Sequence, residues 1–71
     1  MKKVHVLRTN IDTLSAIAEV SNLLNGISSI HRWSIDIEDI DNVLRVESDS
    51  LTSTDIIKTL QQAGYSAEDL I

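Results

Sequence analysis

Apolar and polar residues alternate near the start of the chain, with the period of two that a half-buried β-strand requires. Residues 3–8 predict a first strand, and we place Val4 and Val6 on its inner face, toward the core. His5 then lies on the opposite face, away from the helices. A turn-like stretch follows the strand and ends in Asp12, a residue type that caps helix N-termini.

The spacing of apolar residues then changes to that of a helix. The apolar positions of this segment are Leu14, Ile17, Val20, Leu24 and Ile27. We expect the helix to begin near Asp12, its N-cap. Its end has two interpretations, the first of which is a C-cap at Asn25-Gly26 with Gly26 in the left-handed conformation. The alternative is a last turn that continues to Ile27 or Ser28.

Two further alternating stretches flank an acidic turn. Residues 31–37 place Trp33, Ile35 and Ile37 on one face, and residues 43–48 form the next strand. The turn between them is longer than the tight two-residue connection, so the pair predicts a hairpin with a longer loop.

A second amphipathic helix is predicted near the end of the chain. Its apolar positions are Ile56, Ile57, Leu60 and Ala63. Several hydroxyl residues that can cap a helix precede it, and Gly64 ends it. We expect residues 65–71 to form a last edge strand through Tyr65 and Ala67.

The predicted order of elements is strand, helix, strand, strand, helix, strand. Because crossover connections are right-handed and both helices pack on one face, this order predicts an α+β protein. The expected architecture is a ferredoxin-like βαββαβ two-layer sandwich, with a four-stranded antiparallel sheet and two helices. At 71 residues the chain forms a single domain, residues 1–71.

Charge and composition narrow the range of functions. Six basic residues against eleven acidic ones give a net charge of −5, which argues against nucleic acid and against an anionic membrane surface. The chain has no cysteine, so disulfides, thiolate catalysis and cysteine metal sites are excluded. With neither a run of apolar residues long enough to span a membrane nor a leader peptide, we expect a cytoplasmic protein.

The hairpin and the end of the second helix resemble a known family. The second helix closes in Ala63-Gly64-Tyr65, and the hairpin contains Trp33-Ser34-Ile35-Asp36 followed by Val43-Leu44-Arg45-Val46. In this order and spacing, the chain is similar over essentially its whole length to the heavy-metal-associated domain. That domain is the module of copper chaperones and of the cytosolic parts of metal-pumping ATPases. The resemblance implies a soft-metal loop between the first strand and the first helix.

In that family the loop is Gly-Met-Thr-Cys-x-x-Cys, whose two thiolates hold Cu(I), Zn(II) or a similar soft ion. A gapless alignment places the loop on residues 10–16. Ile11 takes the methionine position and can keep its apolar role, while Thr13 and Ala16 take the two cysteine positions. A hydroxyl is a poor ligand for a soft ion and alanine has no donor atom, so the site is lost. The resemblance places Tyr65 beside this loop, and we expect it to pack against Ile11.

No other group of residues rebuilds a metal site. His5 and His31 are the only imidazoles, and we expect them on strands two spacings apart, about 9.6 Å. That is too far for two bonds of about 2.0–2.1 Å to one ion. The acidic turn lacks the spacing of an EF-hand and is expected to be solvated; its carboxylates are Asp36, Glu38, Asp39 and Asp41. Asp12 is likewise expected to cap the helix rather than to bind a hard metal.

The sequence contains no catalytic motif, and we expect neither an enzyme nor a bound cofactor. The preferred interpretation is a degenerate heavy-metal-associated-like domain that acts as a protein-binding or regulatory module, through an edge strand or the acidic hairpin. The alternative is a metal chaperone or metal-transport accessory protein. It would bind a metal ion through non-thiol ligands, or work alongside a cysteine-bearing paralogue. Both interpretations are compatible with the sequence.

Overall fold

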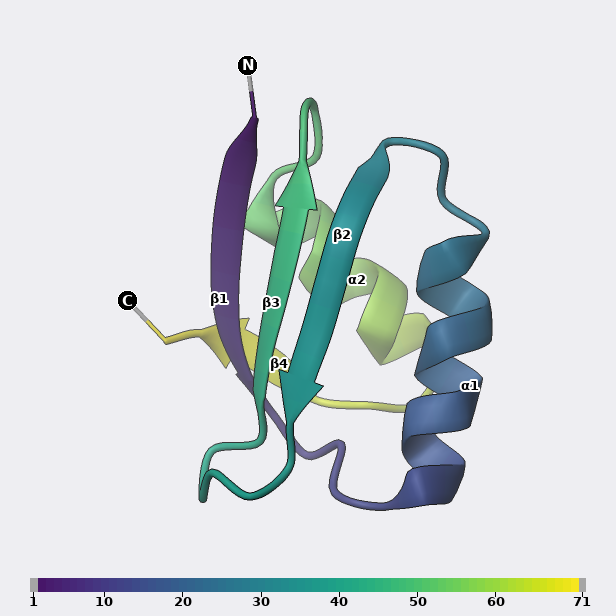
Figure 1. Cartoon of the computed structure of the whole chain (residues 1–71), viewed down its shortest axis with the longest axis vertical. Coiled ribbons are helices and arrows are strands. Elements are labelled where there is room, and N and C mark those ends of the chain that lie inside the picture. The colour runs from purple at the N-terminus through teal and green to yellow at the C-terminus, as the bar shows by residue number, and fades with distance from the viewer. Residues whose placement is uncertain (1, 71) are drawn as a thin grey trace.

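The chain folds into one antiparallel sheet covered on one face by two helices (Figure 1). The computed structural model describes residues 2–70. The elements are β1 (Lys3–Thr9), α1 (Leu14–Asn25), β2 (Ile30–Asp36), β3 (Val43–Ser48), α2 (Ser53–Gln62) and β4 (Ala67–Asp69). The four strands lie in the order β2-β3-β1-β4, with every neighbouring pair antiparallel. This is the predicted ferredoxin-like βαββαβ sandwich.

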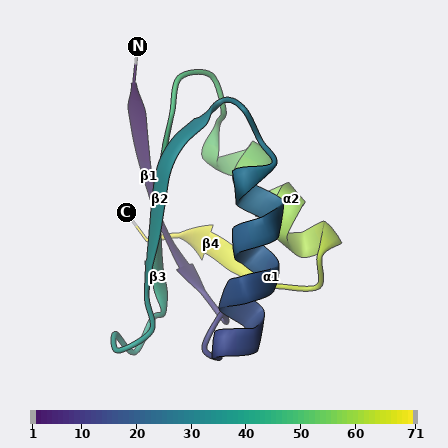
Figure 2. The same ribbon diagram turned by 45° about the vertical axis from the view of Figure 1, so that its right-hand side comes forward.

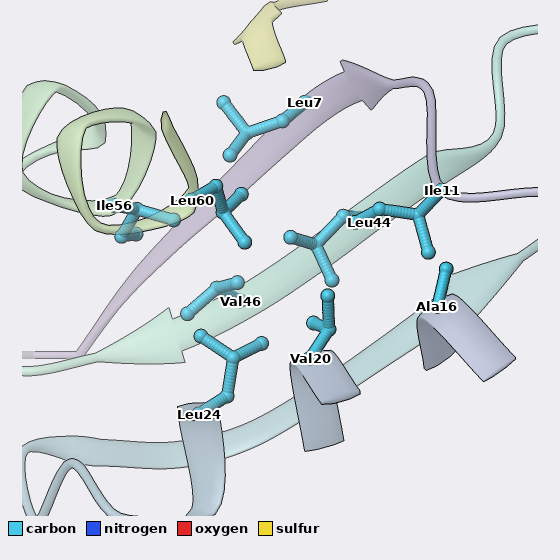
Figure 3. Packing of buried hydrophobic residues seen from close by; sticks show 9 residues of the cluster. All are labelled: Leu7, Ile11, Ala16, Val20, Leu24, Leu44, Val46, Ile56 and Leu60. Atoms are coloured by element: carbon cyan, nitrogen blue, oxygen red, sulfur yellow. The ribbon is translucent and has the colours of Figure 1, made fainter. Parts of the chain in front are cut away.

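The hydrophobic core lies between the sheet and the helices (Figure 3). Its buried apolar side chains are Leu7, Ile11, Ala16, Val20, Leu24, Leu44, Val46, Ile56 and Leu60. On the inner strand β3, Leu44 and Val46 are fully buried. On β2, Trp33 and Ile35 pack against the same core but are only partly buried, because β2 lies at an edge of the sheet.

The predicted faces of β1 are wrong. His5 and Leu7 lie opposite buried residues of β3, so it is these two that face the helices. Val4 and Val6 lie on the outer face, where Val4 is 47% exposed. Leu7 is fully buried and fixes the phase of the strand. His5 fits on the inner face because its Nε2 atom is 2.9 Å from the carbonyl oxygen of Leu51.

The N-cap of α1 is Thr13 rather than the predicted Asp12. The Thr13 hydroxyl accepts the backbone N–H of Ala16, whereas Asp12 precedes the cap. The helix ends at Asn25, the first of the two ends that the sequence allowed, but Gly26 has a φ of −80° and is right-handed. Further hydrogen-bonded turns carry the chain from this point into β2, so no reversal into the left-handed region is needed.

Helix α2 has the predicted caps at both ends. At its start, Thr52 and Asp55 form a capping box in which each side chain accepts the backbone N–H of the other. At its end, Gly64 has a φ of +94° and the Tyr65 amide donates to the carbonyl of Leu60, 3.0 Å away. This arrangement is a Schellman motif. Tyr65 therefore lies in the turn before β4 and not, as predicted, in the strand itself.

The β2–β3 hairpin has the predicted long loop, residues 37–42. Trp33 and Ile35 face the helices as expected, and the indole Nε1 of Trp33 donates to Oδ1 of Asn25 over 2.9 Å. Because β2 ends at Asp36, Ile37 lies in the loop and is 37% exposed.

Candidate functional site

The loop between β1 and α1, where the sequence resemblance predicts the position of a soft-metal loop, is held at its start by hydrogen bonds. The Asn10 amide donates to the carbonyl of Ser66, and the Ser66 amide donates to Oδ1 of Asn10. The Thr9 hydroxyl donates to the carbonyl of Asn42 over 2.7 Å and accepts the Ile11 amide over 3.1 Å. The loop is thus tied to the residue before β4 on one side and to the hairpin on the other.

The two positions that align with the thiolates lie in one turn. Thr13 Oγ1 is 3.1 Å from the backbone nitrogen of Ala16, whose own side chain is in the core and 9% exposed. Ile11 is fully buried, which confirms its predicted apolar role. Asp12 is exposed. This turn therefore holds a helix cap and a buried methyl group where the resembled family has two sulfur atoms.

Tyr65 is half-buried and packs against the core cluster that includes Ile11. Burial raises the pKa of the Tyr65 phenol above its ordinary value, and the nearby carboxylate of Glu19 acts in the same direction.

The two histidines lie apart, as predicted. His5 is on β1 and His31 on β2, and β3 lies between these strands. His31 is exposed, with Nε2 2.7 Å from Oδ2 of Asp49. The hydrogen bond from His31 lowers the pKa of the Asp49 carboxyl. Each imidazole therefore has its own partner, and the two do not share a site.

In the acidic hairpin, carboxylates bond to the loop's own backbone. Oδ1 of Asp36 accepts the Glu38 amide over 3.1 Å, and Oδ1 of Asp39 accepts the Asp41 amide over 2.9 Å. Ile40, at the turn between them, is 94% exposed. In residues 2–70 no three His, Asp or Glu side chains are grouped so that they could hold a metal ion.

The free edge of β2 is a candidate binding surface. The sequence predicted binding through an edge strand but did not say which strand. The strand order leaves β2 and β4 at the edges, and β2 has seven residues where β4 has three. Figure 2 turns this side of the molecule forward and shows β2 in front of the other strands. Trp33 and Ile35 line the inner side of this edge.

Comparisons with known proteins give no relative: no family model, no curated protein and no solved structure matches the chain. Within residues 2–70 no pocket is found. Over the same residues, neither helix combines the length and the apolar character needed to cross a membrane.

Proposed function

We propose that this chain is a protein-binding module, similar to a heavy-metal-associated domain without its soft-metal site, and that it binds through the free edge of β2. The observation that carries the proposal is the form of this edge. β2 is a seven-residue strand with a second strand on one side only. Its other side offers a row of backbone donors and acceptors to an added strand.

The side chains along β2 suit such an addition. The helix-facing side carries Trp33 and Ile35, both of which keep exposed apolar surface. The outer side carries Arg32, Ser34 and Asp36, all exposed. In β-addition the backbone hydrogen bonds supply affinity and the alternating side chains supply specificity. This edge can provide both.

The usual protections of an edge strand are few in β2. Such strands are commonly shortened, or carry lysine or proline. The chain contains no proline, and β2 contains no lysine. One irregularity occurs between Ile30 and Arg32, at the start of the strand, and the regular pairing from residues 32 to 36 is intact.

The residues at the aligned loop do not fit a soft-metal ion. Thr13 uses its hydroxyl to cap α1, and Ala16 contributes a methyl group to the core. Neither side chain offers a thiolate, and both have structural roles.

A site-specific photo-crosslinker tests the proposal. It is placed at Ser34, at the centre of the regularly paired residues 32–36 of β2, and in a control protein at Lys58, which is exposed on α2. Each variant is produced in cells of the organism from which the protein comes, so that its natural partner is present, and these cells are irradiated. We expect the crosslinker at position 34 to give one crosslinked product of defined mass. The crosslinker at position 58 should give no product of the same mass. Absence of any product from position 34, or equal products from both positions, contradicts the proposal.

A further inference from the structure

We propose that the partner of the β2 edge is a second copy of this chain, paired antiparallel along β2 with Ser34 opposite Ser34. The two sheets then form one continuous sheet with a twofold axis at its centre. This inference rests on the proposed function, because it names the partner of the same edge.

The pairing of β2 with β3 defines the two faces of the edge strand. Trp33 lies opposite Val46, and Ile35 lies opposite Leu44. Because Val46 and Leu44 are fully buried in the core, the side chains of Trp33 and Ile35 face the helices. Ser34 lies opposite the exposed Arg45, on the outer face. Arg32 and Asp36 share that outer face, because residues two apart in a strand point to the same side.

Centred on Ser34, the strand is complementary to itself. Arg32 of one copy lies opposite Asp36 of the other, and Trp33 of one copy lies opposite Ile35 of the other. Symmetry repeats each pair, so the outer face gains two pairs of opposite charge and the inner face gains two apolar pairs. Cross-strand pairs of both kinds stabilise antiparallel sheets.

The neighbouring registers lack this match. Centring on Trp33 places Ile30 opposite Asp36, and centring on Arg32 places two arginines opposite each other. Centring on Ile35 leaves only residues 34–36 paired within the strands. If one strand slips by a single residue relative to the other, the apolar side chains of one copy point to the opposite face of the sheet. Among these registers, therefore, only the one centred on Ser34 places opposite charges across from each other on the outer face and apolar side chains across from each other on the inner face.

In the single chain, the side chains that would form these pairs are at least partly exposed. The Arg32 side chain is 80% exposed, and its Nε atom lies 4.0 Å from Oε2 of Glu47, a long ion pair. Asp36 is exposed and accepts a hydrogen bond from the Glu38 amide through Oδ1 alone. Trp33 and Ile35 are only partly buried, and the free edge adjoins them.

Charge reversal at the two outer positions tests the register. Arg32→Asp places Asp opposite Asp36, and Asp36→Arg places Arg opposite Arg32, twice in each case. By sedimentation equilibrium at about 0.15 M salt, we expect wild type to form a concentration-dependent dimer. Each single variant should weaken it on the order of tenfold or more, and the double variant Arg32→Asp with Asp36→Arg should restore it. The control Lys58→Asp has the same change in charge as Arg32→Asp but lies away from the edge, on α2, and should dimerise like wild type.

Disulfide formation tests the central pair. Cα atoms directly opposite in an antiparallel pair are about 4.5–5.5 Å apart, within the range that a disulfide spans. The chain has no native cysteine, so Ser34→Cys supplies the only thiol. We expect Ser34→Cys to form a covalent dimer under mild oxidation, faster than Ser50→Cys in the exposed loop after β3. Arg32→Cys mixed with Asp36→Cys should crosslink faster than either variant alone.

The outcomes separate this inference from the proposed function. A wild-type protein that stays monomeric, with Ser34→Cys no faster than Ser50→Cys, overturns self-pairing. If the photo-crosslinker at Ser34 still captures a different protein, binding through the edge stands and only the partner is wrong. If it captures nothing, both proposals fail. A dimer that forms but ignores both charge reversals and does not crosslink at Ser34 uses another surface, and also overturns the inference.

Discussion

The hydroxyl oxygen of Thr13 accepts a hydrogen bond from the backbone N–H of Ala16 over 3.1 Å, and this bond caps the first helix. These are the two positions at which the resembled family carries thiolates. Thr13 therefore helps to hold the fold where, by the resemblance, a cysteine would hold a metal. Ala16, three residues further, belongs to the buried core.

Thr13→Ala removes this cap and leaves an unpaired amide at the start of α1. We expect it to lower the free energy of unfolding by about 1 kcal/mol, and Thr13→Ser to keep most of the stability. Asp12→Ala is the matched control, because Asp12 is exposed and does not cap the helix; its effect should stay below about 0.5 kcal/mol. Urea unfolding compares the three. A larger loss for Asp12→Ala than for Thr13→Ala would show that the cap is misassigned.

The types and order of the elements could be predicted from the sequence, because they depend on local signals. Hydrophobic period separates strand from helix, and Thr52, Asp55 and Gly64 mark the ends of α2 with side-chain and backbone chemistry that acts within a few residues. The predicted cap of α1, Asp12, is wrong by one residue: the adjacent Thr13 is also a residue type that caps helices, and only its position in the structure shows that it is the one that does so.

The faces of β1 and the free edge of β2 could be assigned only from the tertiary structure. Val4 and Val6 are more apolar than His5, yet the phase follows Leu7, which β3 and the helices bury. The carbonyl of Leu51, distant in sequence, then accommodates His5. The residues of β2 are plain in the sequence, but their availability depends on the sheet order, which leaves β2 at an edge.

Trp33 joins the hairpin to the end of α1. It packs against the core and donates to Oδ1 of Asn25. We expect Trp33→Ala to cost about 3 kcal/mol, at the lower end of the range for large aromatic side chains because the ring is only partly buried. Asn25→Ala, which removes the hydrogen bond alone, should cost about 0.5–1.5 kcal/mol. Thermal and urea unfolding at low protein concentration provide the comparison. An unchanged melting temperature for Trp33→Ala would mean that the ring does not pack against the core.

The two glycines should respond to alanine in opposite ways. Gly64 has a φ of +94°, so Gly64→Ala is strained and should destabilise the protein by about 1 kcal/mol. Gly26 has a φ of −80°, and an added Cβ would lie 3.5 Å from two carbonyl oxygens, an ordinary contact. Gly26→Ala should therefore be neutral, or stabilise by up to about 1 kcal/mol. Equal losses in urea unfolding would contradict the backbone conformation at one of the two sites.

Acid should weaken the cap of α2. The hydrogen bond from the Thr52 backbone amide, followed by that from its hydroxyl, lowers the pKa of Asp55 below its ordinary value. Because the folded pKa is the lower one, the carboxylate stabilises the fold above the unfolded pKa, and this contribution is lost as pH falls through the folded pKa. Asp55→Asn has no such charge. We expect the stability difference between wild type and Asp55→Asn to shrink from about pH 6 to about pH 3. A constant difference would show that the charge of Asp55 does not support the cap.

Retention of Cu(I) against a competing chelator is the most direct test of the central claim that residues 10–16 do not form a soft-metal site. Wild type should release the ion, and its amides from Thr9 to Ile17 should keep their NMR shifts. The double variant Thr13→Cys with Ala16→Cys is the positive control, since residues three apart share a helix face and a helix start lowers the pKa of a thiol. It should retain Cu(I) if the loop geometry is the family's. Retention of one equivalent by wild type, with shifts of the same amides, would contradict the claim.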